Sequence, residues 1–193
     1  MKIPQSWSDL NINQFIELRA ALEMRDIEAL DRNVLIVSAL LNKSSEWVEE
    51  NLRLQDLTEI IAQCKFTAQL PSEKPIKYFW LNGTLWKCDL HVNKIIPAQY
   101  IDLSLITKSE DEIIDNLHKI MAIFCRPIFQ SKYNSDKANK CAEVFYKKMN
   151  SEVAYSLAVF FCNLYTELFN ATQTYLMGEA LKNLNQANQN QSA

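Results

Sequence analysis

Cys88 and His91 come closest to a metal-binding motif in this chain of 193 residues. A cysteine and a histidine at this short spacing can supply two ligands, whereas a tetrahedral zinc ion needs three or four protein ligands at a structural or catalytic site. No second pair of this kind lies nearby, and Cys64 is distant in the sequence. The pattern therefore predicts a hairpin cysteine and a surface histidine, with no bound metal.

His118 lies close enough to Asp115 for a helix to place both side chains on one face. Such a pair could perform acid–base chemistry or respond to pH, but a surface histidine beside a carboxylate is far more common. The remaining carboxylate clusters suit helix starts or polar helix faces, so we expect no acid–base pair in an apolar pocket. These clusters are Asp26 with Glu28, Glu49 with Glu50, and Glu110 with Asp111 and Glu112.

Glycine is scarce, because the chain contains only Gly83 and Gly178. Phosphate-binding loops need clustered glycines, since a side chain would hold the backbone away from the phosphates. The sequence therefore excludes a P-loop and a dinucleotide-binding turn. A catalytic triad assembled only in space would leave no such trace. We expect a protein that is not an enzyme and has no cofactor, and a small intracellular enzyme remains an alternative.

The composition, with 48% hydrophobic residues, is that of a chain able to bury an ordinary core. A net charge of −3 argues against a dedicated nucleic-acid binder, which usually carries a basic face. The densest cationic cluster is interrupted by acidic residues, and we interpret it as a solvated helix face, with phosphate contact as the alternative. It consists of Lys132, Lys137, Lys140, Lys147 and Lys148. Five widely spaced cysteines indicate a reducing compartment.

Hydrophobic periodicity predicts a mainly α fold: a helical bundle-like domain with one small β-hairpin insertion and a long C-terminal helix. We expect an N-terminal helical block over residues 1–70, a hairpin segment over 71–96 and a C-terminal helical block over 97–193, in one compact domain. Helices are expected over 13–22, 26–41, 45–52, 54–64, 97–107, 112–125, 136–148 and from 150 or 151 to about 185. The apolar stripes of the first two are Phe15, Leu18 and Leu22, and Ile27, Leu30, Val34, Val37 and Leu41.

The hairpin is predicted over residues 76–81 and 84–90, on either side of Asn82-Gly83. Asparagine followed by glycine supplies the two positive-φ positions of a type I′ turn. Trp80 and Trp86 flank this turn almost symmetrically. They could pair across the hairpin, and we expect them to stabilise the hairpin or the core, with contact to a ligand or partner as the alternative.

The last predicted helix contains a single charged residue, Glu167, between Val153 and Gly178. A membrane span is disfavoured, because several polar side chains would then lie in hydrocarbon. We expect one stripe to hold the fold: Val153, Leu157, Phe160, Leu164 and Leu168. We expect the outer flank to bind a partner: Phe161, Tyr165, Phe169, Tyr175 and Leu176. Burial of the whole helix within the fold is the alternative.

The order of these segments resembles that of small proteins from the structural gene region of tailed phages that infect Bacteroidota. The matching segments are IPQSWSDLNINQFIEL, LRLQDLTEIIAQCKF, PAQYIDL and NLHKIMAIFCRPIF, with a short hairpin and a long helix that contains FF. The resemblance implies a ring component of the head–tail junction or tail, or else a tail-assembly chaperone that is missing from the mature particle. It implies no catalytic residues.

The ring component is the reading that we favour, because a long and almost uncharged helix suits a permanent packed interface. The chain would then be an oligomeric virion protein that is assembled in the host cytoplasm. Its expected partners are other phage structural proteins and further copies of itself. We expect it to bind no specific nucleic acid and no membrane.

Overall fold

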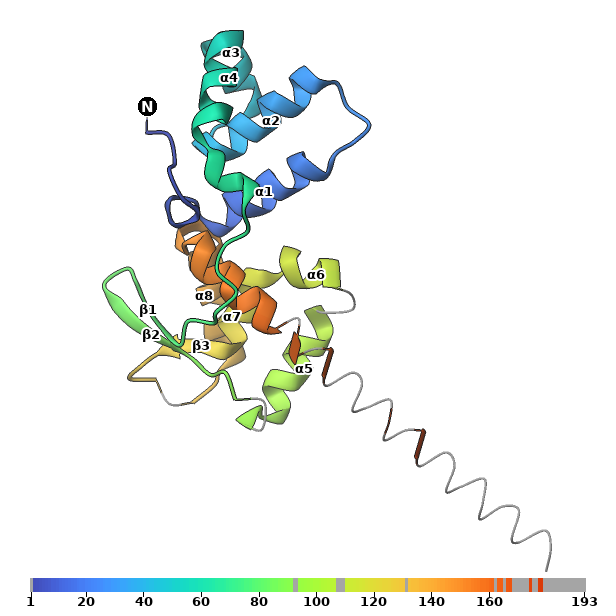
Figure 1. Ribbon diagram of the computed structural model, residues 1–193. Helices are drawn as coiled ribbons and strands as arrows, with labels where there is room; N and C mark the ends of the chain where they lie inside the picture. The colour runs from blue at the N-terminus through green and yellow to red at the C-terminus, as the bar shows by residue number, and fades with distance from the viewer. Residues whose placement is uncertain are drawn as a thin grey trace, which may run out of the picture.

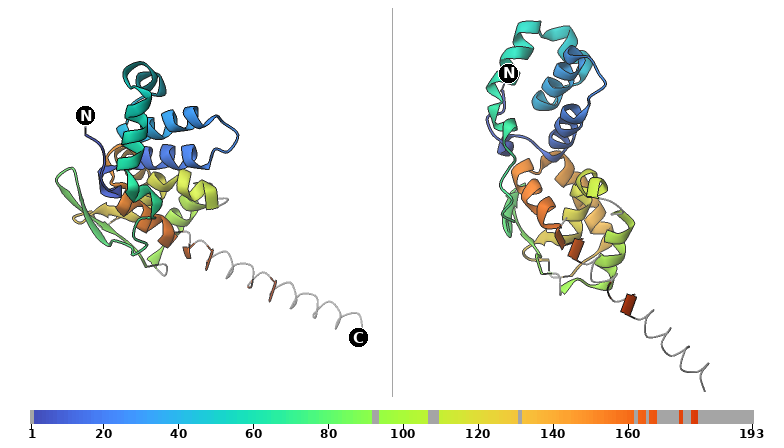
Figure 2. Two further views of the ribbon diagram at one scale, coloured as in Figure 1. Left: turned by 45° about the horizontal axis from the view of Figure 1, so that its top comes forward. Right: turned by 45° about the vertical axis from the view of Figure 1, so that its right-hand side comes forward.

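A computed structural model describes residues 2–91, 94–106, 110–130, 132–161, 163–164, 166–167, 174 and 177–178. The chain is mainly helical and carries one small antiparallel sheet, so the predicted fold class is confirmed. The helices α1–α4 lie at one end of the molecule, and α5–α8 lie with the sheet at the other end (Figures 1 and 2). The buried side chains form two apolar clusters, one in each of these groups of elements.

The first group begins with a 3₁₀ turn, η1, and ends with another, η2. Its elements are η1 (Trp7–Asp9), α1 (Ile12–Glu23), α2 (Ala29–Leu41), α3 (Ser45–Asn51), α4 (Leu54–Gln63) and η2 (Lys65–Ala68). All four expected helices are present, although α2 begins at Ala29 rather than at Asp26. The Ser44 hydroxyl accepts a hydrogen bond from the Trp47 N–H and caps α3, because its oxygen satisfies a donor at the helix start.

The predicted apolar stripes of α1 and α2 are only partly correct. Phe15 and Leu18 are buried in α1, and Val34 and Val37 are buried in α2. Two other leucines of the stripes, Leu22 on the last turn of α1 and Leu30 on the first turn of α2, are instead exposed. The small residues Ala21 and Ala39 are buried, and α1 packs mainly against α2, which also contacts α3 and α4.

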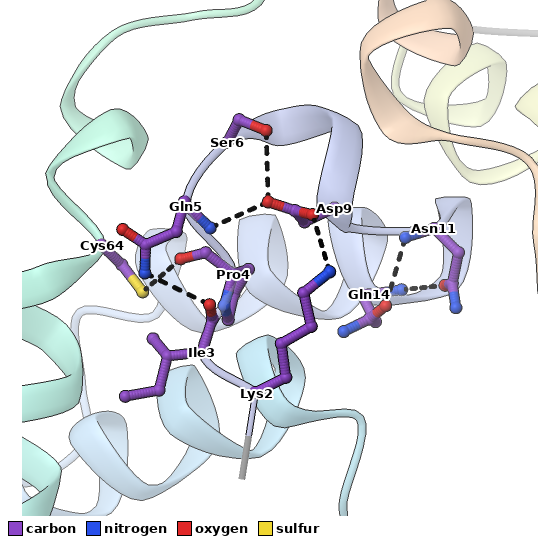
Figure 3. Close-up of polar contacts among 9 residues, drawn as sticks. All are labelled: Lys2, Ile3, Pro4, Gln5, Ser6, Asp9, Asn11, Gln14 and Cys64. Atoms are coloured by element: carbon purple, nitrogen blue, oxygen red, sulfur yellow. Dashed lines mark hydrogen bonds and ion pairs between the residues drawn. The ribbon is translucent and has the colours of Figure 1, made fainter.

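The extended segment before α1 is fixed by the Asp9 carboxylate (Figure 3). That carboxylate accepts hydrogen bonds from the Gln5 N–H at 3.0 Å, the Ser6 hydroxyl at 3.3 Å and the Lys2 ammonium at 3.3 Å. The backbone bond from Gln5, and then the bond from Lys2, lower the pKa of Asp9. The thiol of Cys64 lies 3.6 Å from the Pro4 carbonyl oxygen, so the segment is also held against the end of α4.

A single antiparallel bridge between Asn11 and Asn150 joins the two groups of elements. The Ile12 N–H donates to the Met149 carbonyl at 3.1 Å, and the Ser151 N–H donates to the Leu10 carbonyl at 2.8 Å. Each asparagine also caps the helix that follows it. The Asn11 side chain accepts from the Gln14 N–H, and the Asn150 side chain accepts from the Glu152 N–H.

The sheet has the order β1-β2-β3 and consists of β1 (Tyr78–Leu81), β2 (Thr84–Cys88) and β3 (Cys125–Pro127). The hairpin is confirmed, and Asn82 and Gly83 have φ values of 51° and 71°, as a type I′ turn requires. The third strand was not predicted. It follows directly from Pro127, which ends the preceding helix and favours an extended conformation in the residue before it.

Trp80 and Trp86 do not pair across the hairpin, but Trp86 belongs to the core as expected. The register places Trp80 opposite Leu85, and Phe79 opposite Trp86. Because neighbouring positions on a strand point to opposite faces, the two tryptophans lie on opposite sides of the sheet. Trp86 is buried against Phe145, with ring centroids 4.9 Å apart, whereas Trp80 is 71% exposed.

The second helical group packs around α7, whose side chains are buried on most sides. Its elements are α5 (Pro97–Ile106), α6 (Glu110–Asp115), α7 (Leu117–Phe124) and α8 (Ser135–Lys148), followed by a helix that is continuous over 151–161. The single helix expected over 112–125 is divided at Asn116. The amide of Asn116 donates to the Glu112 carbonyl at 3.0 Å and to the Ile106 carbonyl at 3.4 Å. Asparagine side chains commonly compete with the helical backbone in this way.

Two buried glutamines also link helices through hydrogen bonds from the side chain to backbone groups. The Gln14 side chain accepts from the Asn11 N–H at the start of α1, and its amide donates to the Ala39 and Leu40 carbonyls at 3.0 and 3.1 Å. The Gln99 side chain accepts from the Ile96 N–H before α5 and donates to the Ile123 carbonyl at 2.9 Å. Each glutamine therefore satisfies backbone groups at the start of one helix and the end of another.

We predict that Gln14→Ala lowers the free energy of unfolding by about 1–3 kcal/mol, because it leaves buried backbone groups without their partner. Chemical denaturation of the purified variant measures this change. Gln63→Ala is the matched control, since Gln63 is an exposed residue of α4; we expect a change within about 0.5 kcal/mol. Equal stability of both variants would contradict the role of the Gln14 side chain.

Candidate functional site

The structure does not bring Cys88 and His91 together as ligands of one metal ion. Cys88 points into the core from β2 and is fully buried, whereas His91 is exposed beyond the end of the strand. Within the described part of the chain, no three histidine, cysteine or acidic side chains are grouped closely enough to hold a metal. The residue that does face Cys88 is another cysteine.

Cys88 lies directly opposite Cys125 in the pairing of β2 with β3. The Asp89 N–H donates to the Phe124 carbonyl at 2.9 Å, so the adjacent Cys88–Cys125 pair is a non-hydrogen-bonded pair of the ladder. Side chains approach most closely at such positions. Both thiols are buried and free, and burial, followed by the neighbouring Cys88 side chain, raises the pKa of Cys125 well above its ordinary value. The sequence did not indicate that Cys88 and Cys125 would be neighbours, because the strand β3 was not predicted.

We predict that oxidation links Cys88 to Cys125. With excess hydroxyethyl disulfide, each pair of thiols loses two hydrogens while the reagent is reduced to two thiols. Mass spectrometry of the unreduced protein and its peptides should show this cross-link. The reaction should be faster at alkaline pH, because the attacking species is a thiolate and the pKa of Cys125 is raised.

Cys64→Ser is the control for this experiment, since Cys64 is also buried but lies in the other core cluster. It should leave the cross-link intact, whereas Cys88→Ser should abolish it. A cross-link that survives Cys88→Ser, or its absence from the unaltered protein after complete reaction of the other thiols, would contradict the inferred juxtaposition.

His118 and Asp115 do not form an acid–base pair. They lie on either side of the interruption at Asn116, Asp115 is exposed, and no hydrogen bond joins the two described side chains. The His118 ring packs on Tyr146 with ring centroids 4.8 Å apart, and its buried Nδ1 has no partner among the described residues. Burial, and then the charge of Lys119, lower the pKa of His118 to about 4. The side chain is therefore neutral at neutral pH.

Asp102 and Tyr133 form the best-defined polar contact beside a cavity. Their oxygens lie 2.5 Å apart, and the cavity next to them has a volume of about 190 Å³. Burial, and then the hydrogen bond to Asp102, raise the pKa of Tyr133. The phenol therefore remains a hydrogen-bond donor rather than a base. Ligand pockets usually span about 300–1,000 Å³, so we interpret this contact as a link between α5 and the segment before α8.

The other charged groups singled out in the sequence lie on the surface. Asp26, Glu28, Glu49 and Glu50 are exposed, while the side chains of Glu110 and Asp111 lie outside the described residues. The lysines of the predicted cationic face are exposed as well. They are Lys132, Lys137, Lys140, Lys147 and Lys148.

The C-terminal helix buries a different side from the one predicted. Phe161 is only 3% exposed and stacks on Phe124, with ring centroids 4.6 Å apart, so its assignment to an outer flank is wrong. Leu157 and Leu164 are buried as expected, whereas Val153 and Phe160 are only partly buried. Apolar residues surround this helix, so the stripe that faces the core could not be fixed by spacing. Tyr165, Leu168, Phe169, Tyr175 and Leu176 lie outside the described residues.

The outward face of α5 is unusually apolar. Tyr100, Ile101 and Leu105 lie on this side of the helix and are each at least half exposed, with Leu105 at 70%. The opposite side, with Gln99 and Leu103, is buried. A surface helix normally places polar residues outward. A group of exposed apolar side chains on one face is typical of a contact surface.

A second apolar surface lies on the outer face of the sheet. Trp80, Leu85 and Ile128 follow one another across the three strands, because the Ile128 N–H continues the ladder by donating to the Leu85 carbonyl at 3.1 Å. Phe129 follows in the turn after β3 and is 94% exposed. The sequence indicated the hairpin but not this surface, since it depends on the pairing with β3.

Among the residues that the structure places, none of the helices has both the length and the apolar character needed to cross a bilayer. Comparison with known protein families, with curated proteins and with solved structures finds no match to this chain. The two exposed apolar surfaces, on α5 and on the sheet, are the described features that indicate contact with another molecule.

Proposed function

We propose that this chain is a non-enzymatic protein of a tailed-bacteriophage particle, an oligomeric ring or connector component of the head–tail or tail region. It acts through helical protein–protein contacts with copies of itself and with other phage structural proteins. It requires no cofactor, binds no specific nucleic acid and enters the virion after assembly in the host cytoplasm. The sequence resemblance supports the phage assignment.

The outward face of α5 is the observation that carries the proposed contact function. Exposing Tyr100, Ile101 and Leu105 to water has a cost that burial against a partner would remove, at about 25 cal/mol for each Å² of apolar surface covered. The nearby Asp102 is only partly exposed and is already bound to Tyr133. The Asp102 carboxylate is thus held toward Tyr133, and the three side chains that form the outward face are themselves uncharged. A second subunit is the occupant that we propose.

The C-terminal helix remains part of this proposal. Tyr165, Phe169, Tyr175 and Leu176 are the aromatic and aliphatic residues predicted to contact a partner, and they continue the chain beyond the buried Phe161 and Leu164. Aromatic anchors often dominate the energy of an interface.

We predict that Leu105→Glu dissociates the assembly, because a carboxylate buried in an apolar contact without a partner is strongly unfavourable. Sedimentation velocity over a range of concentrations should show the unaltered chain as an oligomer and the variant as a monomer. Leu54→Glu is the matched control: Leu54 on α4 is 68% exposed, nearly the same as Leu105, and this variant should assemble normally.

Two results would count against a self-association surface on α5. One is a monomeric unaltered chain at every concentration. The other is an equal loss of assembly in both variants, which would indicate a general effect of added charge. Circular dichroism of each variant establishes that the fold is retained.

A further inference from the structure

The strand β1 forms a free edge of the sheet, and the hairpin projects from the body of the molecule (Figure 1). The Cys88 N–H donates to the Lys77 carbonyl at 2.9 Å, which fixes the alternation of the ladder. Tyr78 and Trp80 therefore occupy non-hydrogen-bonded pairs with β2. Their N–H and C=O groups point away from β2, and no other described residue bonds to them.

The side chains beside this edge form an apolar row. Trp80 on β1 lies next to Leu85 on β2, and Ile128 continues the row beyond β3. A strand added to β1 would place the residue opposite Trp80 on the same outer face, because directly paired residues point to the same side. An apolar side chain at that position would cover the Trp80 ring.

The next row of the same face is cationic. Tyr78 lies opposite Lys87, which lies opposite Arg126, and the Lys77 ammonium lies 5.7 Å from the centre of the Tyr78 ring. The Arg126 guanidinium already has an acidic neighbour, the Asp89 carboxylate at 3.8 Å. Lys77 and Lys87 have no ion pair with any residue that the structure describes. An acidic residue opposite Tyr78 would lie near the Lys77 ammonium and on the other side of Tyr78 from Lys87, about two strand spacings or roughly 10 Å from the Lys87 backbone, a separation that a long lysine side chain can reduce.

We propose that the free edge of β1 binds an extended segment of a partner protein that carries an apolar and an acidic residue two positions apart, so that both lie on the outer face of the sheet. Backbone hydrogen bonds to Tyr78 and Trp80 would give affinity, and these two outward side chains would give specificity. A second copy of β1 fits less well, because pairing two copies would bring Lys77 and Lys87 near their own counterparts. The proposal goes beyond self-association through α5 and does not depend on it.

The probe is a short capped peptide of the repeat Val-Thr-Glu-Thr, in which valine and glutamate lie two positions apart on one face, titrated into the ¹⁵N-labelled full chain and followed by NMR. We expect shifts at the Tyr78 and Trp80 amides and the Trp80 indole, with a dissociation constant on the order of 1 mM or below. The same peptide with lysine in place of glutamate should not bind. Shifts confined to other residues, or equal binding of the lysine peptide, would overturn the proposal.

Two pairs of variants test the backbone and charge contributions separately. Tyr78→Pro removes the outward N–H, whereas Tyr78→Ala keeps it and loses only the ring; a proline is tolerated at an outward position of an edge strand. We expect binding about tenfold weaker in the proline variant than in the alanine variant. Lys87→Glu should also weaken binding about tenfold, and Lys137→Glu, on the exposed face of α8, should leave it unchanged.

If the Tyr78→Pro variant unfolds, its NMR spectrum will lose dispersion. The proposal is then tested by two other comparisons: Lys87→Glu against Lys137→Glu, and the glutamate peptide against the lysine peptide. Concentration-dependent shifts at Tyr78 and Trp80 without peptide would identify a second copy as the occupant and overturn the commitment to an acidic segment. Because the α5 contact is measured by sedimentation of Leu105→Glu, failure of either idea can be distinguished from failure of the other.

Discussion

The antiparallel bridge between Asn11 and Asn150 determines how the two helical groups of this protein meet. Each asparagine uses its backbone to pair with the other segment and its side chain to begin a helix. The start of α1 and the start of the C-terminal helix are thereby held side by side. As a result Ile12, although it belongs to α1, is buried in the core cluster of the second group. The Ser151 hydroxyl, which donates to the Trp7 carbonyl at 2.5 Å, strengthens the same junction.

The interior built on this junction uses its buried reactive side chains in packing and in hydrogen bonds. Burial beside Cys88 raises the pKa of Cys125 and keeps its thiol protonated. His118 packs on Tyr146, and burial lowers its pKa so that the ring is neutral. The raised pKa of Tyr133 keeps its hydroxyl as a hydrogen-bond donor to Asp102. These groups contribute to packing and to links between elements. The features that remain unexplained by folding lie outside, on α5 and on the sheet, where large apolar side chains face solvent. Contacts with other proteins would cover those apolar surfaces.

Local signals in the sequence predicted the local structure well. The Asn82-Gly83 turn was predicted from two adjacent residues, and the expected helix end at residue 125 is one residue beyond the observed end of α7 at Phe124. The strand β3 and the Cys88–Cys125 pair could not be predicted, because they depend on two segments that are far apart in the chain.

The prediction of which side chains are buried was less successful, for a different reason. The burial of Phe161 was misassigned because a helix with apolar residues on several sides has no unique stripe, and only contact with Phe124 selects one. The exposed face of α5 was not predicted, because apolar residues lie on several sides of this helix and its buried side carries the polar Gln99. Residue type and spacing therefore do not show which side faces solvent.

The most direct test of the proposed role is quantitative mass spectrometry of tailed-phage particles purified from the biological source of this sequence. A ring or connector component should be present in every preparation, at a fixed ratio to the other structural proteins, because a symmetric assembly has a defined number of subunits. Intact particles that lack the chain would contradict the account and would assign it instead to the assembly chaperones.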